Sequence, residues 1–197
     1  VEHRIAQEIV LGIGGVRALR ALGLSPQVFH TNEGHAGFLS LERIREHVAA
    51  GMPFAHAVET VRAGGVFTTH TPVPAGIDRY TRDLMERFLG PYCAGLGCTL
   101  DGLMEIGSDG ETPDNPRFNM AALGLRMSAR SNAVAALHGD VSRKMFAHLW
   151  PGALDVETPI TSVTNGIHSK TWVSARIDSL LSRTVNPIWD GADPSVW

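Results

Sequence analysis

Three polar segments each follow a run of residues that is typical of a β-strand. They are NEGH at residues 32–35, HTPVPAG at residues 70–76 and NGIH at residues 165–168. Their imidazole, carboxylate and amide groups supply both hydrogen-bond donors and acceptors, which suits them to bind a polar molecule. Ligands of parallel α/β sheets bind beyond the carboxyl ends of the strands. We therefore expect these three segments to line one cleft.

His70 stands at the end of the predicted strand VFTTHT, and two prolines follow it closely. Pro72 disfavours helical backbone at Thr71, and Pro74 prolongs the extended path. This pattern predicts a rigid turn that presents His70 at the exit of the strand. A structural histidine at the edge of the core is the alternative, and the two similar strand exits favour the functional interpretation.

The segment HTNEGH has the composition of a metal site but not the spacing of one. Its candidate side chains are His30, Asn32, Glu33 and His35. The two histidines do not have the HExxH spacing that would place them on one face of a helix. We therefore expect no metal here, and instead a polar network at a strand-to-helix junction that frames a ligand cleft.

The run LGIGGVRAL is similar to a dinucleotide-binding loop. Gly12 and Gly14 fit the pattern G-x-G-x-x-G, but Arg17 occupies the last glycine position and a helix, not a strand, precedes the run. Close packing at a turn between two helices is the better interpretation. In the segment TNGIH, the pair Asn165-Gly166 is typical of a tight turn, and its amide can donate and accept hydrogen bonds.

Hydrophobic periodicity and turn residues predict alternating helices and short strands. Strands are expected at residues 27–31, 66–71 and 159–163. Helices are expected from about residue 5 to the glycines at 12–15, then at 16–23, 32–51, 53–62, 78–89, 100–105, 119–139 and 141–150. Asp78 is expected to cap the helix at 78–89. Loops are expected to fill most of residues 90–116, and a polar turn at 164–172 leads into a further helix. This alternation is typical of a parallel α/β sheet built from βαβ units.

The composition is that of an ordinary globular protein that can bury a sizeable core. Of its 197 residues, 44% are hydrophobic and 19% charged, and the net charge is −3. No basic block suggests nucleic-acid binding, and no apolar run is long enough to cross a membrane. The two cysteines, Cys93 and Cys98, are too few for a disulfide scaffold. We expect a reducing, cytoplasmic setting.

Six motifs, in order, resemble consecutive signatures of the bacterial alpha-glucan (glycogen, starch and maltodextrin) phosphorylases. They are LGIGGVRAL, HTNEGHAGF, VFTTHTPVPAG, FNMAALGLRMS, SNAVAALHGDVSRKMF and PITSVTNGIHSKTW. The resemblance extends from about Glu8 to Trp172. The chain also begins as if within a helix, which makes it similar to an internal fragment of such a protein.

The resemblance implies a two-lobed glycosyltransferase fold of the B type, with a Rossmann-like parallel sheet in each lobe. Residues 1–168 would be the later part of the N-terminal lobe, and residues 169–197 an incomplete crossover into the second lobe. The implied reaction is reversible phosphorolysis of a terminal α-1,4-linked glucose to glucose 1-phosphate, with pyridoxal phosphate as cofactor. The implied partners are an α-1,4-glucan, phosphate and, in the full-length form, a second copy of the chain.

Four residues take their expected roles from this resemblance. His70 matches a catalytic histidine that hydrogen-bonds the glucosyl residue, and its carbonyl is expected to help stabilise an oxocarbenium-like transition state. Asn165 matches an asparagine that holds a sugar hydroxyl, and His35 matches a histidine at the border of the same cleft. Trp172 matches an aromatic residue near the cofactor pocket.

One departure limits what this chain would do alone. The family's Schiff-base lysine lies downstream of the matching motifs, and neither Lys144 nor Lys170 stands in the family's cofactor motif. The chain is therefore expected neither to bind pyridoxal phosphate covalently nor to catalyse phosphorolysis by itself. The alternatives are a non-catalytic glucan-binding or interaction module and a nucleotide-sugar glycosyltransferase of the same fold.

Overall fold

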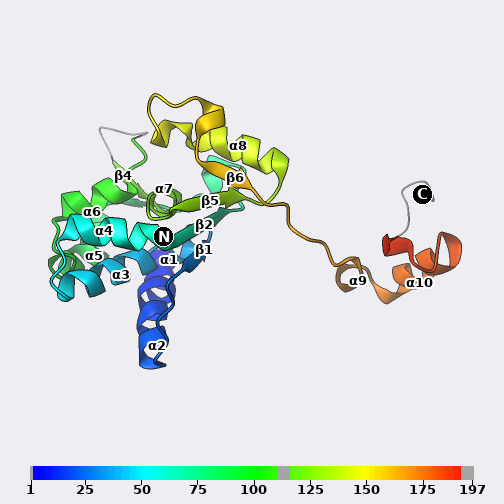
Figure 1. The fold of residues 1–197 in the computed structure, drawn as a ribbon, viewed down its shortest axis with the longest axis horizontal. Helices are drawn as coiled ribbons and strands as arrows, with labels where there is room; N and C mark the ends of the chain where they lie inside the picture. The colour runs from blue at the N-terminus through cyan, green and yellow to red at the C-terminus, as the bar shows by residue number, and fades with distance from the viewer. Residues whose placement is uncertain (1, 111–115, 192–197) are drawn as a thin grey trace. The chain divides into compact units, whose positions relative to one another are not determined.

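The computed structural model describes residues 2–110 and 116–191. The chain divides into two compact units, residues 1–164 and residues 165–197 (Figure 1). The predicted boundary at residue 168 concerns two lobes of a longer protein and stays a prediction.

A four-stranded parallel sheet forms the centre of the first unit. Its strands are β1 (Phe29–Asn32), β2 (Gly65–Thr69), β5 (Arg130–Ala133) and β6 (Ile160–Ser162), in the order β1-β2-β5-β6. All neighbouring strands run parallel, so their carboxyl ends lie along one edge. The predicted parallel α/β architecture of the Rossmann-like kind is confirmed.

One face of the sheet packs against two helices, α7 (Met120–Arg126) and α8 (Ala136–Phe146). Phe67 of β2 is fully buried there with Ile160 of β6. Gly124 allows α7 to approach, because a Cβ at this position would lie 2.4 Å from the Phe67 ring. Any larger residue at position 124 would therefore push the helix away from the sheet.

A second core lies among the remaining helices of the first unit. These helices are α1 (Glu2–Ile9), α3 (Leu39–Ala49), α4 (Phe54–Ala63), α5 (Arg82–Leu96) and α6 (Leu100–Gly107). The rings of Phe38, Tyr80 and Phe118 meet at its centre, with centroids 6.0–6.5 Å apart. Tyr80 and Phe118 belong to a small antiparallel pair of strands, β3 (Arg79–Thr81) and β4 (Arg117–Asn119).

The predicted end of the first helix at the glycine cluster is wrong. After α1 the chain continues through a π-helical turn, Val10–Gly14, into α2 (Gly15–Ala21). A Cβ at Gly12 would lie 2.7 Å from the backbone nitrogen of Leu39. Gly12 therefore allows close packing against Leu39, as expected. The turn that was expected between two helices is absent here, because the segment from Glu2 to Ala21 is continuously helical.

The helix predicted at residues 32–51 begins later than expected. Residues Gly34–Ala36 form a 3-10 turn, and α3 starts only at Leu39. The strand before it ends at Asn32, and Glu33 has a positive φ that no α-helix accepts. Residues 33–38 therefore connect β1 to α3 and do not form part of an α-helix.

The long helix predicted at residues 119–139 is also wrong. Asn119 does begin a helix, and its side chain accepts the backbone N–H groups of Ala121 and Ala122. That helix ends at Arg126, and β5 follows at residues 130–133. The helix predicted at 141–150 is present but begins earlier, as α8, and continues into a 3-10 turn at Ala147–Leu149. Pairing with β2 and β6 in the buried sheet overrides the helical propensity of this alanine-rich run.

Asp78 does not cap a helix as predicted. The cap of α5 is Thr81, whose hydroxyl accepts the backbone N–H of Leu84. The helix then passes Pro91 and ends at Leu96, so part of the predicted loop is helical. Burial of Leu89 and Leu96 on one face of α5 favours this continuation. Residues 111–115 of that predicted loop lie outside the described residues.

The described residues of the second unit form the helices α9 (Ser169–Trp172) and α10 (Ala175–Thr184) and a 3-10 turn at Trp189–Gly191. The helix predicted to follow residues 164–172 is present as α10, but the last four residues of the predicted turn already form α9. Trp189 is buried, and its indole Nε1 donates to Asp178 of α10 at 2.9 Å. Residues 192–197 of the predicted crossover lie outside the described residues. Among the described residues of both units, no helix is long and apolar enough to cross a membrane.

Candidate functional site

The exits of β1 and β2 are joined by one side chain, that of Glu33. Its Oε1 accepts the backbone N–H of Thr71 at 2.7 Å, the backbone N–H of His70, and the hydroxyl of Thr69 at 3.3 Å. Its own backbone N–H donates to the carbonyl of Thr68 at 2.9 Å. The structure therefore brings two of the three predicted segments, residues 32–35 and 70–76, into direct contact.

The backbone of Glu33 is strained. With φ 63° it is the one non-glycine residue with a positive φ among the described residues. Such a conformation costs about 1–3 kcal/mol for a residue with a side chain, and residues of this kind are concentrated at functional sites. The carboxylate is nevertheless buried, with 8% of the residue exposed. Its position is thus fixed by burial and by the groups that it accepts.

His70 lies where the sequence predicts, immediately after the last residue of β2. The residue is exposed, although its backbone N–H is bonded to Glu33. Val73 is extended before Pro74, and residues Pro74–Gly76 form a 3-10 turn. The turn is therefore held at both ends, by Glu33 at its start and by the proline geometry after it. This arrangement leaves the imidazole open to a ligand.

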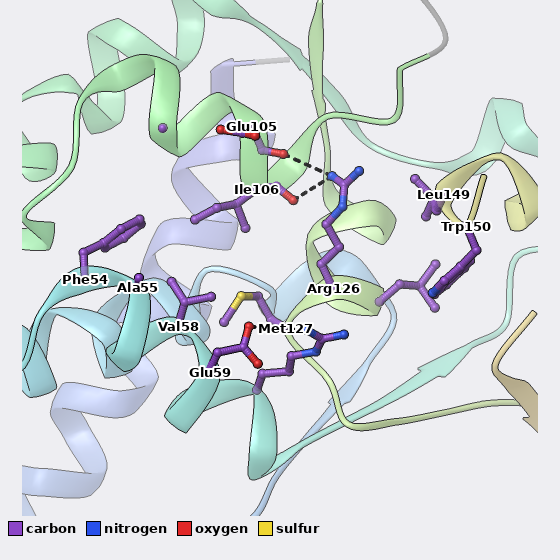
Figure 2. A pocket seen from close by; sticks show the side chains of 13 residues that line it. Phe54, Ala55, Val58, Glu59, Glu105, Ile106, Arg126, Met127, Leu149 and Trp150 are labelled. Carbon is purple, nitrogen blue, oxygen red and sulfur yellow. Dashed lines mark hydrogen bonds and ion pairs between the residues drawn. The ribbon is translucent and has the colours of Figure 1, made fainter. Parts of the chain in front are cut away.

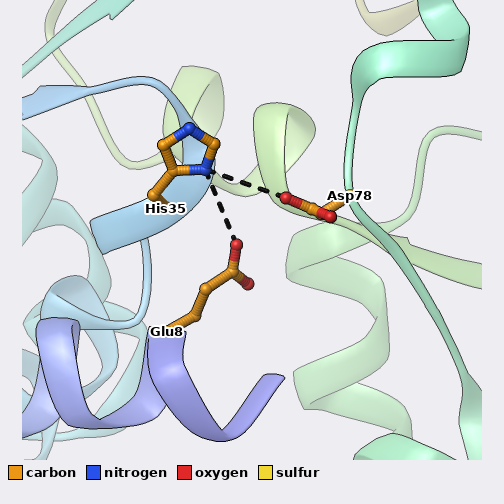
Figure 3. Close-up of side chains that lie close together, drawn as sticks. All are labelled: Glu8, His35 and Asp78. Atoms are coloured by element: carbon orange, nitrogen blue, oxygen red, sulfur yellow. Dashed lines mark ion pairs between the residues drawn. The ribbon is translucent and has the colours of Figure 1, made fainter. Parts of the chain in front are cut away.

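His35 belongs to a charged network rather than standing free (Figure 3). Its Nδ1 lies 2.6 Å from Nη2 of Arg4 and 3.7 Å from a carboxylate oxygen of both Glu8 and Asp78. Arg4 also donates to Asp78 through two nitrogens, at 3.0 and 3.1 Å. The network ties α1, the turn after β1 and the segment after the His70 turn together.

Glu8 is the buried member of this network, with 1% of the residue exposed. Burial raises the pKa of Glu8 to about 7, although the hydroxyl of Tyr80 donates to its Oε2 at 2.6 Å. Potential ligand atoms of Glu8, His35 and Asp78 lie within 4.8 Å of one another. Since the guanidinium of Arg4 already contacts all three side chains, it supplies the positive charge that a metal ion would bring. The expected absence of a metal stays a prediction.

A row of polar side chains crosses the sheet on the face opposite Phe67. The hydroxyl of Thr68 donates to Oδ1 of Asn132 at 2.8 Å and lies 2.7 Å from Nε2 of His30. A hydroxyl has one proton, so Nε2 of His30 must be the donor in this pair. The row includes His30 of the HTNEGH segment and reaches Asn132 of β5, a strand that is not predicted from the sequence.

A cavity of about 580 Å³ lies elsewhere in the first unit (Figure 2). Trp150, Phe54 and Val58 line it together with Arg126, whose Nη1 donates to the carbonyls of Glu105 and Ile106 at 3.0–3.1 Å. The adjacent residue Met127 contacts Gly65, the first residue of β2. The cavity is therefore at the amino edge of the sheet, away from His70.

Asn165 and Trp172 belong to the second unit. Asn165 is exposed, and Trp172 on α9 is 82% exposed. His168, between them, has its Nδ1 2.5 Å from the hydroxyl of Thr171. The expected contributions of Asn165 to a sugar site and of Trp172 to a cofactor pocket stay predictions.

The two lysines of the chain do not suit covalent attachment of pyridoxal phosphate. Lys144 is exposed on α8, and Lys170 is half-exposed with its Nζ 4.0 Å from Asp190. A lysine that forms an imine at neutral pH is typically desolvated, because burial lowers its pKa. No step through that cofactor can be derived from the residues that the structure describes.

From the sequence, Glu33 is predicted only as a member of a polar cluster, and its contact with His70 is not foreseen. It also missed Arg4, Glu8 and Tyr80, and it gave Asp78 a capping role. The contacts of these residues join segments far apart in the chain, such as Glu8 and Tyr80, which are 72 positions apart. The charged pair Arg4 and Glu8, four residues apart on a helix, was the one local signal.

Curated proteins with related sequences include phosphorylases. A glycogen phosphorylase of Mycobacterium tuberculosis is 52% identical over 182 residues, which are 88% of this chain and 21% of that protein. A maltodextrin phosphorylase of Thermococcus litoralis is 41% identical over 189 residues, 96% of this chain and 22% of that protein. A glycogen phosphorylase of Aquifex aeolicus is 34% identical over 177 residues, 90% of this chain and 25% of that protein. No family model matches the chain.

The site and fold define an α/β protein whose strand exits carry a fixed histidine turn. The chain is homologous to one segment of the alpha-glucan phosphorylases, and the resemblance inferred from its six motifs is confirmed. The chain spans about a fifth of the length of the glycogen phosphorylase of Mycobacterium tuberculosis and of the maltodextrin phosphorylase of Thermococcus litoralis.

Proposed function

We propose that this chain is a segment of an alpha-glucan phosphorylase and forms one wall of the site that holds the terminal glucosyl residue. The single observation that carries the proposal is the His70 turn, an exposed imidazole at a strand exit whose peptide is fixed by a buried carboxylate. The homology to proteins named glycogen and maltodextrin phosphorylase supports the same reading.

In this proposal the full-length protein transfers a terminal α-1,4-linked glucose to phosphate and releases glucose 1-phosphate. The imidazole of His70 hydrogen-bonds a hydroxyl of the glucosyl residue, and its carbonyl faces the positive charge that develops at the reacting carbon. His35 borders the site from the Arg4 network, and Asn165 binds a second hydroxyl. The two lobes form a glycosyltransferase fold of the B type.

The proposal includes pyridoxal phosphate as the cofactor of the full-length protein, with the lysine that holds it outside these 197 residues. It also includes a homodimer and a cytoplasmic setting. Because neither Lys144 nor Lys170 suits the cofactor, a second candidate function for the chain by itself is glucan binding without catalysis.

A product assay tests the proposed function. A full-length protein containing this segment, loaded with pyridoxal phosphate, is incubated with a maltodextrin and inorganic phosphate. We expect glucose 1-phosphate in the α-configuration, formed only when phosphate is present. Release of free glucose instead, or no product while the maltodextrin still binds, would contradict the phosphorylase proposal, and the second result would favour the binding module.

A further inference from the structure

We propose that Glu33 is the positioning residue of the His70 turn, and that its carboxylate fills an anion-binding pair of backbone N–H groups. The inference rests on the proposed function for its catalytic consequence, but not for the anion site itself. The sequence motifs do not predict such a positioning role for Glu33.

The geometry at the turn is that of an occupied anion site. The N–H groups of His70 and Thr71 are consecutive in the chain, and both point at the same oxygen of Glu33. Successive backbone N–H groups that converge in this way form a concave site for an anion. The hydroxyl of Thr69, which is fully buried, donates to the same oxygen at 3.3 Å. Three donors from three adjacent residues therefore surround one internal carboxylate.

The backbone of Glu33 gives an independent reason to assign it a role. Its φ of 63° is a conformation that glycine adopts without cost and that a residue with a side chain resists. Gly34 follows immediately, packed so closely that a Cβ there would lie 2.7 Å from that of Met120. The chain thus carries glutamate at a position where glycine would relieve strain. The carboxylate is the part of Glu33 that glycine could not replace.

This arrangement has two consequences for the turn. First, the bonds to Glu33 fix the peptide planes on both sides of His70, and so set the direction of its carbonyl and of its imidazole. Second, the internal carboxylate keeps free anions, including a substrate phosphate, out of this particular pair of N–H groups. Removal of the carboxylate should loosen the histidine and open the pair to a small external anion.

The test compares Glu33→Gly and Glu33→Gln in the full-length, cofactor-loaded protein. Glycine relieves the strain and empties the site, whereas glutamine keeps an oxygen acceptor. We expect kcat for Glu33→Gly to fall by about 100-fold, the effect of a small misplacement of a catalytic group. We expect Glu33→Gln to be intermediate, with KM changing less than kcat in both variants.

Formate is the probe that separates positioning from a merely structural role. Added formate should restore at least part of the lost kcat of Glu33→Gly and should raise its melting temperature, with no such effect on the unaltered protein. His70→Ala is the control, because formate cannot replace an imidazole. An unchanged kcat in Glu33→Gly would overturn the proposal. So would a lower kcat that formate does not raise, together with a melting temperature that formate does not raise.

Two further outcomes remain decisive. If Glu33→Gly does not fold, kcat and KM of Glu33→Gln are compared with those of the unaltered protein. A fall in kcat that exceeds the change in KM supports the positioning role, and an unchanged kcat contradicts it. If the unaltered protein makes no glucose 1-phosphate, the proposed function fails, while stabilisation of Glu33→Gly by formate still supports the anion site. Absence of that stabilisation contradicts it.

Discussion

Glu33 and Thr71 are joined by a hydrogen bond of 2.7 Å between a buried carboxylate oxygen and a backbone N–H, although 38 positions separate them in the chain. The bond joins the exit of β1 to the exit of β2, and the same oxygen of Glu33 also accepts the backbone N–H of His70. It explains how an exposed histidine can have a defined orientation. The side chain is free to meet a ligand because the backbone behind it is held.

The glycine cluster near the N-terminus offers a matched pair of substitutions. Gly12→Ala places a methyl group 2.7 Å from the backbone of Leu39, whereas a Cβ at Gly15 meets nothing within 4 Å. We expect Gly12→Ala to destabilise the protein by about 1–3 kcal/mol through overpacking. Gly15→Ala should stabilise it by up to about 1 kcal/mol through helix propensity. Urea unfolding of both variants checks this, and equal effects would contradict the packing role of Gly12.

The raised pKa of Glu8 predicts that stability falls as the pH rises. Burial raises this pKa from 4.5 to about 7, so between these values the folded protein binds a proton that the unfolded chain releases. The free energy of unfolding should therefore decrease from pH 4.5 to 7, by at most about 1.4 kcal/mol per pH unit from this group. The measurement is urea unfolding at several pH values.

Glu8→Gln is the control for this prediction, because glutamine resembles the protonated acid in shape and has no charge to bury. In that variant the decrease from pH 4.5 to 7 should be smaller than in the unaltered protein. If both proteins show the same slope, the buried carboxyl of Glu8 is not its source.

Glu42 predicts a pH dependence of the opposite sign. Burial opposes its ionisation, but hydrogen bonds from Arg45 at 2.7 Å, Arg17 at 3.0 Å and the hydroxyl of Tyr92 outweigh that effect and lower the pKa of Glu42 from 4.5 to about 2. The unfolded chain then binds the proton first as the pH falls. Stability from this group should be complete above pH 4.5 and lost as the pH falls towards 2.

Removing the Glu42 carboxylate should also be costly at neutral pH. It would leave the partly buried guanidinium of Arg45 and the hydroxyl of Tyr92 without their acceptor, so we expect Glu42→Ala to lose about 3 kcal/mol. Glu59→Ala is the comparison, because Glu59 forms an exposed ion pair with Arg62, which is typically worth less than about 1 kcal/mol. Similar losses in thermal unfolding for the two variants would refute the ranking.

Asn165 gives a binding prediction from the second unit. If its amide holds a sugar hydroxyl in the full-length protein, Asn165→Ala should weaken maltodextrin binding by about 1–3 kcal/mol, because a buried partner is left unsatisfied. Asn186→Ala, in the same unit, should leave the affinity unchanged. Calorimetric titration with a maltodextrin measures both, and equal affinities for the two variants would argue against the role of Asn165.

The sequence predicts three of the four strands of the sheet, β1, β2 and β6, because their signals are local. The run VFTT is β-branched and aromatic, and prolines close the turn after it, so both β2 and the position of His70 follow from neighbours in the chain. The same holds for the helix start at Asn119, whose short amide accepts two N–H groups within three residues.

The errors arise where tertiary contacts override local preference. The run RSNA reads as part of an alanine-rich helix, yet it forms β5 because β2 and β6 flank it on both sides. The role of Glu33 could not be read from the sequence, since its partners at His70 and Thr71 are 37 and 38 positions away. The network of Arg4, Glu8 and Asp78 was missed for the same reason.

The most direct test of the central claim is the phosphorolysis rate of His70→Ala measured beside His30→Ala in the full-length, cofactor-loaded protein. His30 lies within β1 and contacts Thr68 in the polar row, whereas His70 stands just beyond the end of β2. We predict that kcat/KM for glucose 1-phosphate formation falls by at least about 100-fold in His70→Ala and changes by less than about threefold in His30→Ala. Near-native turnover in His70→Ala would contradict the account.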